Sequence, residues 1–123
     1  VIVHPTMFRA SGETENLTQE AAAILRKAGI PVALQSAFEG YVPKTRVVLF
    51  EAALAAARAL TFDEALATVT IDAAKLLGVD ARVGSLEAGK DADLALFDGD
   101  PFEYASHVVG VFIDGEQVST SVR

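Results

Sequence analysis

The chain has 123 residues, 51% of them hydrophobic, which is enough for one buried core. Its formal net charge of −7 opposes binding to the phosphate backbone of nucleic acids, and no apolar run is long enough to span a bilayer. The absence of cysteine excludes disulfides and thiolate metal sites, and it favours a reducing compartment, with the cytoplasm as the default location.

The first part of the chain predicts a strand, a helix and a second strand. Residues 1–3 are typical of a short buried strand. A helix is expected to begin near Asn16, with Gln19 as its capping-box partner, and to end at a left-handed Gly29. Residues 31–34 predict a strand covered on both faces, as in a parallel sheet. Together these elements form a βαβ unit.

Three further helices are predicted in the middle of the chain. Residues 44–60 are rich in Ala, Leu and Glu, which favour helix. Thr61 and Glu64 have capping-box spacing and open a second helix. Thr70 is placed to cap a third helix that ends at Gly78. The chain up to this glycine therefore has an α/β pattern.

The remaining residues have a β pattern. Short apolar stretches at residues 94–97 and 108–113 predict strands. Asp114 and Gly115 form a strong two-residue hairpin signal, and Val118 lies on the expected return strand.

The most specific motif is RVGSLEAGKDADL at residues 82–94. It resembles the tail signature of the amidohydrolase superfamily, in the branch of imidazolonepropionase-like and prolidase-like enzymes. Residues 70–78 (TIDAAKLLG) resemble the closing helix of that family, and residues 98–102 and 111–115 complete the pattern. Because its glycines suit tight turns and its polar residues flank a strand, we interpret the motif as a structural hallmark.

The resemblance implies a (β/α)8 metallo-hydrolase barrel beside a small β-sandwich that both ends of the full chain build. Residues 1–78 then correspond to the last strands and helices of the barrel, with residues 1–6 as strand seven and residues 31–36 as strand eight. Residues 79–123 correspond to the carboxy-terminal part of the sandwich. The fold class is therefore α/β with a composite β domain.

The same resemblance implies hydrolysis of a carbon–nitrogen bond, in a non-peptide or dipeptide-like amide, by water on a divalent metal such as zinc. The family takes its metal ligands from earlier barrel strands and from an Asp that ends strand eight. Here Ala37 stands where that Asp is expected. Alanine neither binds metal nor moves a proton, so we expect no metal ligand within this chain and no metal bound by it alone.

Glu39 is the candidate catalytic residue, because its longer side chain can stand in for the missing carboxylate at the mouth of a barrel. A solvated loop carboxylate is the alternative. Gln35 and Ser36 end strand eight and are candidates for substrate contact. His4 ends strand seven, where it is either a substrate contact or a hydrogen-bonded structural histidine.

Tyr41, Lys44 and Arg46 gather near the start of a predicted helix. Positive charge there opposes the helix dipole, so the group indicates either an anion-binding role toward substrate or a salt-bridged face.

The chain lacks an initiator Met and opens inside a predicted strand, so we expect a fragment or processed product that is inactive alone. Two barrel strands leave open edges, which predicts a homo-oligomer or pairing with a missing amino-terminal segment. The expected ligand of the full protein is a small-molecule amide, with no nucleic-acid or membrane partner. The alternative is a catalytically silent relative that serves as a binding or assembly subunit.

Overall fold

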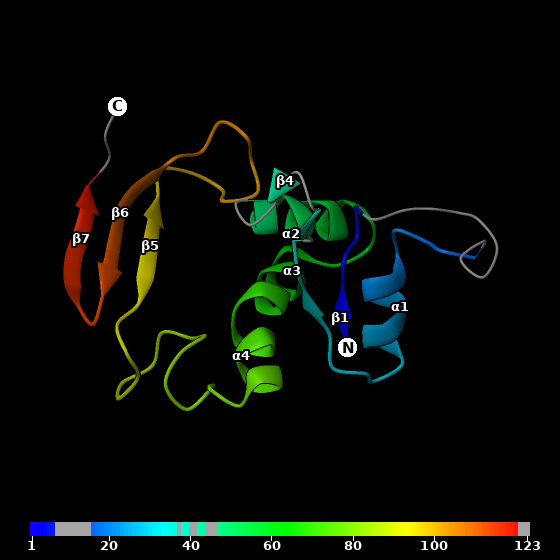
Figure 1. The fold of residues 1–123 in the computed structure, drawn as a ribbon, viewed down its shortest axis with the longest axis horizontal. Helices are drawn as coiled ribbons and strands as arrows, with labels where there is room; N and C mark the ends of the chain where they lie inside the picture. Colours follow the sequence, from blue (N-terminus) through cyan, green and yellow to red (C-terminus); the bar gives the residue numbers. More distant parts are fainter. Residues whose placement is uncertain (7–15, 37, 40–41, 44–46, 121–123) are drawn as a thin grey trace.

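A parallel strand pair lies at the centre of the first part of the molecule (Figure 1). Strand β1 (Ile2–Val3) pairs with β2 (Ala33–Leu34), and helix α1 (Ala21–Lys27) connects them. In this register Val3 lies opposite Leu34. The predicted βαβ unit is therefore present. The computed structural model describes residues 1–6, 16–36, 38–39, 42–43 and 47–120.

Helix α1 begins later than its sequence predicts. The backbone N–H of Glu20 donates to Thr18 Oγ1 at 3.2 Å, so residues before Ala21 form a turn and Glu20 caps the helix without a side-chain bond. The capping box expected at Asn16 was wrong for this reason. The end of the helix was predicted correctly, since Gly29 has the left-handed φ of +74°.

Alanine-rich helices cover the strand pair. Helices α2 (Val48–Ala57) and α3 (Phe62–Val69) pack on each other and on β2. Small side chains let the helices approach the sheet closely. The buried apolar residues of this core are Ala22, Ala23, Val32, Leu34, Ala52, Ala55, Leu60 and Ala65.

The predicted capping box opens α3. Thr61 Oγ1 accepts from the Glu64 backbone N–H at 3.2 Å, and Glu64 Oε2 accepts from the Thr61 backbone N–H at 2.8 Å. Helix α4 (Ile71–Leu77) follows and ends at Gly78, with φ +70°. Thr70 occupies the N-cap of α4, but its hydroxyl donates back to the Leu66 carbonyl at 2.8 Å and does not cap the new helix.

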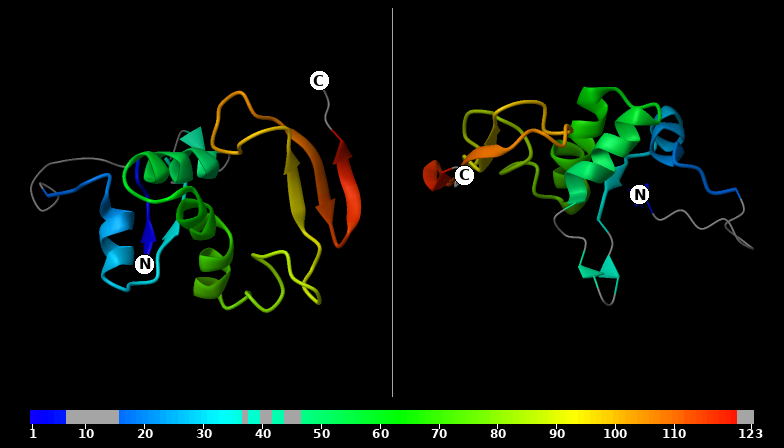
Figure 2. Two further views of the ribbon diagram at one scale, coloured as in Figure 1. Left: turned by 180° about the vertical axis from the view of Figure 1, so that it is seen from behind. Right: turned by 90° about the horizontal axis from the view of Figure 1, so that it is seen from above.

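A three-stranded antiparallel sheet stands beside the helices (Figures 1 and 2). Its strands are β5 (Leu94–Phe97), β6 (Val108–Ile113) and β7 (Glu116–Thr120), in that spatial order. Asp114 and Gly115 both have positive φ, which is the backbone of the hairpin turn that the sequence predicts.

The sheet contacts the helical part mainly through connections. The ring of Phe102, between β5 and β6, lies 4.9 Å from that of Phe62 at the start of α3. Gly84 approaches α4 so closely that a Cβ there would lie 2.7 Å from Ala74 Cβ. No helix in the described ranges is both long and apolar enough to cross a membrane.

Candidate functional site

His4 directly follows β1 and lies at the carboxyl edge of the parallel pair. Gln35 and Ser36 follow β2 at the same edge, because parallel strands end on the same side. The Gln35 backbone N–H donates to the Val3 carbonyl at 3.0 Å, so the pairing continues up to these residues. The structure therefore brings together three of the predicted site residues. Gln35 is exposed, whereas His4 and Ser36 are partly buried.

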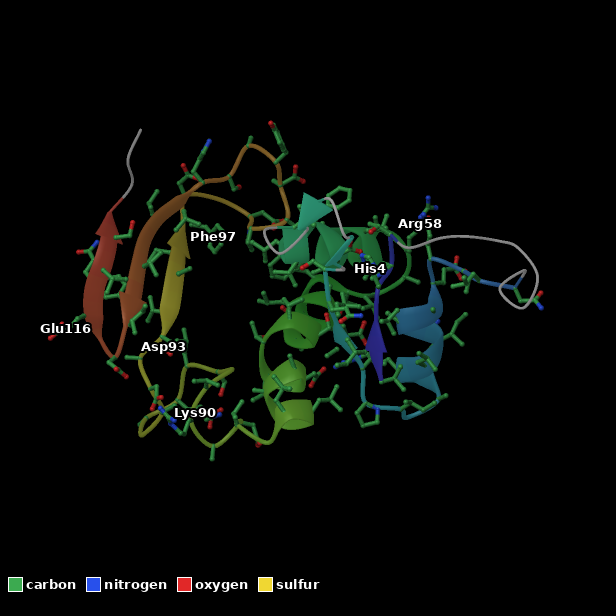
Figure 3. The ribbon with its side chains drawn as sticks, in the orientation of Figure 1. His4, Arg58, Lys90, Asp93, Phe97 and Glu116 are labelled. Carbon is green, nitrogen blue, oxygen red and sulfur yellow. The ribbon has the colours of Figure 1, made fainter. Side chains whose placement is uncertain are left out.

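Glu51 projects into this edge from the first turn of α2, and it is fully buried. His4 Nε2 lies 3.1 Å from Glu51 Oε1, and their side chains are 9% and 1% exposed. Figure 3 shows His4 at the end of β1, on the side of α2. A histidine and a glutamate far apart in sequence thus form one buried pair.

Thr6 completes this cluster. Its backbone N–H donates to Glu51 Oε2 at 2.9 Å, and its hydroxyl donates to Oε1 at 2.5 Å. The Thr6 hydroxyl oxygen also lies 3.1 Å from His4 Nε2. Backbone, hydroxyl and imidazole groups therefore surround the carboxylate, which offsets the desolvation of a buried charge.

A short hairpin continues from the same edge. Strands β3 (Phe38–Glu39) and β4 (Val42–Pro43) pair antiparallel, with Glu39 opposite Val42. Glu39 thus belongs to a paired backbone above β2, but its side chain lies outside what the structure describes. Its catalytic role stays a prediction. The predictions for Ala37, Tyr41, Lys44 and Arg46 also lie outside the described residues.

The opposite edge of the strand pair carries an open depression of about 460 Å³. It lies between the end of α1 and α4, where Arg26 forms an ion pair with Asp72. Active sites of (β/α)8 barrels lie at the carboxyl ends of the strands, whereas this depression lies before β2. The edge with His4 is therefore the candidate site.

A model of the amidohydrolase family matches residues 10–120. The chain belongs to the amidohydrolase family.

Several relatives of this amidohydrolase chain are imidazolonepropionases. The protein from Rhizorhabdus wittichii is 43% identical over 75 residues, which are 60% of this chain and 19% of the relative. The protein from Caulobacter vibrioides is 44% identical over 77 residues, which are 62% of this chain and 19% of the relative. The match therefore spans about a fifth of each enzyme.

Solved amidohydrolase structures have the same fold. An amidohydrolase from Thermotoga maritima is 37% identical, with a TM-score of 0.80 over 93% of this chain and 29% of that one. An adenosine deaminase from Xanthomonas campestris with bound zinc is 26% identical, with a TM-score of 0.65 over 85% of this chain and 29% of that one.

The amidohydrolase family is metal-dependent, so the fit of a metal to this site can be tested. Within the described part of the chain, no three His, Asp or Glu side chains are grouped so that they could hold an ion. His4 and Glu51 bond to each other, and the carboxylate also accepts from Thr6. These residues alone do not fit a metal ion.

The amidohydrolase tail signature is held by its own polar contacts, away from His4 (Figure 3). Asp93 Oδ1 accepts from the Asp114 backbone N–H at 2.9 Å, which joins the signature to the hairpin turn. Lys90 donates to Ser85 at 2.6 Å. A hydrogen bond from Ser85 and then the nearby Lys90 lower the pKa of Glu87. These contacts stabilise the backbone of the signature and of the hairpin turn, as we expect of a structural hallmark.

Glu51 and Thr6 were not among the residues predicted from the sequence. A signal for Glu51 is nevertheless present, since it is the one charged residue in the apolar helix VLFEAALAAA. A helix that is apolar on all sides is buried, and a buried acid needs donors. Nothing local to the sequence, however, indicates that His4 and Thr6 supply them.

Proposed function

We propose that the complete protein containing these residues is an amidohydrolase that hydrolyses a carbon–nitrogen bond in a small-molecule amide. The observation that supports this most is the site-bearing edge: β1 and β2 end in His4, Gln35 and Ser36, in a chain 37% identical to a solved amidohydrolase with a TM-score of 0.80. A divalent metal, zinc by preference, supplies activated water when it is bound.

Within that protein, residues 1–78 form the last strands and helices of a (β/α)8 barrel, with β1 and β2 as strands seven and eight. Residues 79–123 form part of a composite β-sandwich. The parallel pairing of β1 with β2 and their helical cover support the barrel assignment. The exposed apolar side chains of β5 to β7 support a sheet that further strands cover.

The metal ligands, on this proposal, come mainly from parts of the protein beyond the described residues. The described chain contributes the wall of the site, in which His4, Gln35 and Ser36 face substrate. Glu39, and the anion-binding group of Tyr41 and Arg46, complete the substrate side. The 123-residue chain alone is then inactive and associates with itself or with the rest of the protein.

The test is hydrolysis by the complete protein, purified with its metal content measured. Imidazolonepropionate is the first substrate to assay, because matched relatives are imidazolonepropionases. Dipeptide-like amides follow as a second panel. We expect about one or two equivalents of zinc and turnover that chelation abolishes. A metal-loaded protein that hydrolyses neither class contradicts the proposal.

A second function is favoured by one residue. Ala37 occupies the position where the resemblance places a catalytic Asp, and this supports a silent subunit that binds a ligand without hydrolysing it. Introducing the carboxylate separates the two functions. If Ala37→Asp creates hydrolysis in an inactive parent, the silent subunit is the native function; if the parent is already active, it is not.

A further inference from the structure

The regular hydrogen bonding between β1 and β2 ends at a proline. The Gln35 backbone N–H donates to the Val3 carbonyl at 3.0 Å. In a regular parallel ladder the next hydrogen bond takes its donor from residue 5. This residue is Pro5, which is buried and has no N–H to donate. The ladder therefore cannot continue in its regular form along the chain that carries the candidate site.

The next backbone donor along the chain bonds to the side chain of Glu51. The Thr6 N–H donates to Glu51 Oε2 at 2.9 Å. The Thr6 hydroxyl donates to Glu51 Oε1 at 2.5 Å. Two donors of one residue thus bind the two oxygens of one carboxylate, an arrangement called the Thr6–Glu51 tie below. Because hydrogen bonds are directional, the tie determines the orientation of the Thr6 backbone as well as its distance from α2.

The acceptor side of the tie is rigidly mounted. Glu51 is 0% exposed, and Ala52 and Ala55 on the same helix belong to the buried core, at 0% and 2% exposure. A side chain enclosed in this way keeps one rotamer. The β3–β4 hairpin connects β2 to α2. The Thr6–Glu51 tie therefore joins the chain that leaves β1 to the chain that leaves β2.

This junction lies beside the proposed substrate contacts. His4 precedes Thr6 by two residues, and its Nε2 lies 3.1 Å from Glu51 Oε1. Apolar contacts would join α2 to β1 without the desolvation of a carboxylate, but they are not directional and would not specify an orientation. The tie instead determines where the His4 ring lies relative to Gln35 and Ser36. The position of the ring, and not its protonation, depends on it.

We propose that Glu51 is a positioning residue which, through its two hydrogen bonds to Thr6, places the end of β1 against the end of β2 and so sets the affinity of the site for its amide substrate. The effect on affinity rests on the proposed hydrolase function, whereas the tie rests on the contacts alone. Glu51 is buried, so it acts through Thr6 and His4. Because the tie holds the wall of the site and not the reacting atoms, its loss should raise KM more than it lowers kcat.

Hydrogen exchange in the complete protein tests the tie. The Gln35 amide is the internal reference, because its hydrogen bond lies within the strand pair. In the parent, we expect the Thr6 amide to exchange within about tenfold of the Gln35 rate. Leucine accepts no hydrogen bond, so in Glu51→Leu the Thr6 amide should exchange at least about tenfold faster relative to Gln35. A Thr6 amide that is unprotected in the parent, or unchanged relative to Gln35 in Glu51→Leu, overturns the tie.

Kinetics of the complete protein test the positioning role, on imidazolonepropionate or on the dipeptide-like amide that it hydrolyses. Thr6→Val removes the hydroxyl donor at nearly constant shape and should raise KM about 5- to 20-fold, with kcat within about threefold of the parent. Thr6→Ser keeps the donor and should recover most of this loss, with KM within about threefold. Thr68→Val is the matched control, because it removes a buried hydroxyl bond to the Ala65 carbonyl within α3. Its KM should stay within about twofold of the parent.

A merely structural role gives a different result. It lowers the fraction of folded enzyme and leaves the KM of the folded molecules unchanged, so an unchanged KM in Thr6→Val overturns the positioning role. A Thr6→Ser variant that recovers nothing overturns it as well. In a Glu51→Leu protein that folds, adding Thr6→Val should raise KM no further, because both substitutions break the same tie. An additional rise means that Thr6 acts on the substrate directly, which overturns the role of Glu51. If Glu51→Leu does not fold, the threonine variants decide alone.

The outcomes also separate this proposal from the hydrolase function. An active parent with unchanged KM in Thr6→Val overturns the effect on affinity and leaves the hydrolase function standing. A parent that hydrolyses no amide overturns the hydrolase function and the effect on affinity with it, while the exchange of the Thr6 amide still decides whether the tie exists.

Discussion

The two parts of the chain differ in how completely they bury their side chains. In the helical part, Ala52 is 0% exposed and even the polar Glu51 and Thr68 are inaccessible. Among residues 79–119, only Gly110 is buried. The sheet instead leaves Leu96 at 47% and Val118 at 56% exposure. One part contains a core, and the other has strands that are hydrogen-bonded but hardly packed.

The difference explains where a site can be held rigidly. A side chain keeps one rotamer when packing and hydrogen bonds surround it, as they do at Glu51. A three-stranded sheet with little cover gains stability only when further strands or helices bury one face. Substitutions in the helical part should therefore change the stability of the isolated chain. The effect of substitutions in the sheet should depend on whether further strands or helices cover it.

The largest effect is expected for Glu51→Ala. It leaves the backbone N–H and the hydroxyl of Thr6 without their buried acceptor and removes the Glu51 partner of His4, which should lower the free energy of unfolding by about 3–5 kcal/mol. Urea unfolding of the isolated chain measures the loss. In that chain Leu96 is exposed, so Leu96→Ala is the control from the sheet, at less than about 1 kcal/mol. Equal losses of unfolding free energy in the Glu51 and Leu96 variants would contradict the difference in packing between the two parts.

A smaller effect is expected where the two parts meet. Gly84→Ala combines a φ of +96° with a Cβ 2.7 Å from Ala74 Cβ, and it should cost about 2–3 kcal/mol. Gly78→Ala is the matched control, because its φ is +70° and nothing lies within 4 Å of the added atom. Backbone strain alone should cost about 1 kcal/mol there. If both cost the same in thermal unfolding, the close approach is irrelevant.

Hydrogen exchange should sharpen the contrast between the parts. In the isolated chain, we expect amides of β5 and β7 to exchange at least about tenfold faster than those of α3, because little packing opposes local opening of the sheet. In the complete protein the difference should narrow, since further strands cover the sheet. If the exchange rates of β5 and β7 relative to α3 are the same in the isolated chain and in the complete protein, the composite sandwich is contradicted.

The smallest effect concerns Glu64 on the surface of the core part. A hydrogen bond from the Thr61 backbone N–H, and then one with the Thr61 side chain, lower the pKa of Glu64. Folding therefore favours the ionised form of Glu64. This form stabilises the fold fully above the unfolded pKa of about 4.3, and the stabilisation is lost as the pH falls through the folded pKa. Glu64→Gln should lower the midpoint of urea unfolding at pH 7 and hardly change it at pH 3. A shift of the same size at both values would exclude this linkage.

Local patterns predicted much of the fold. The capping box at Thr61 and the hairpin turn at Asp114 and Gly115 depend on residues within a few positions of each other, and both were predicted correctly. The start of α1 was missed because a turn at Thr18 competes with the expected cap at Asn16. Tertiary packing decides between local alternatives of this kind, and helix propensity takes no account of it.

The site was only half predictable. Family resemblance and parallel strand ends indicated the edge with His4, Gln35 and Ser36. The partners of His4 could not be predicted, because a bond between β1 and α2 is specified by tertiary packing and not by spacing. The role of Glu39 stays a prediction that substitution in the complete protein must decide.

The separation of His4 and Glu51 also bears on the order of folding. Their contact closes 47 residues of chain, more than the pairing of β1 with β2, and this favours its formation after that pairing. A contact that forms after the transition state affects the rate of unfolding and not that of folding. The cluster that holds the histidine should therefore lengthen the lifetime of the folded state without accelerating its formation.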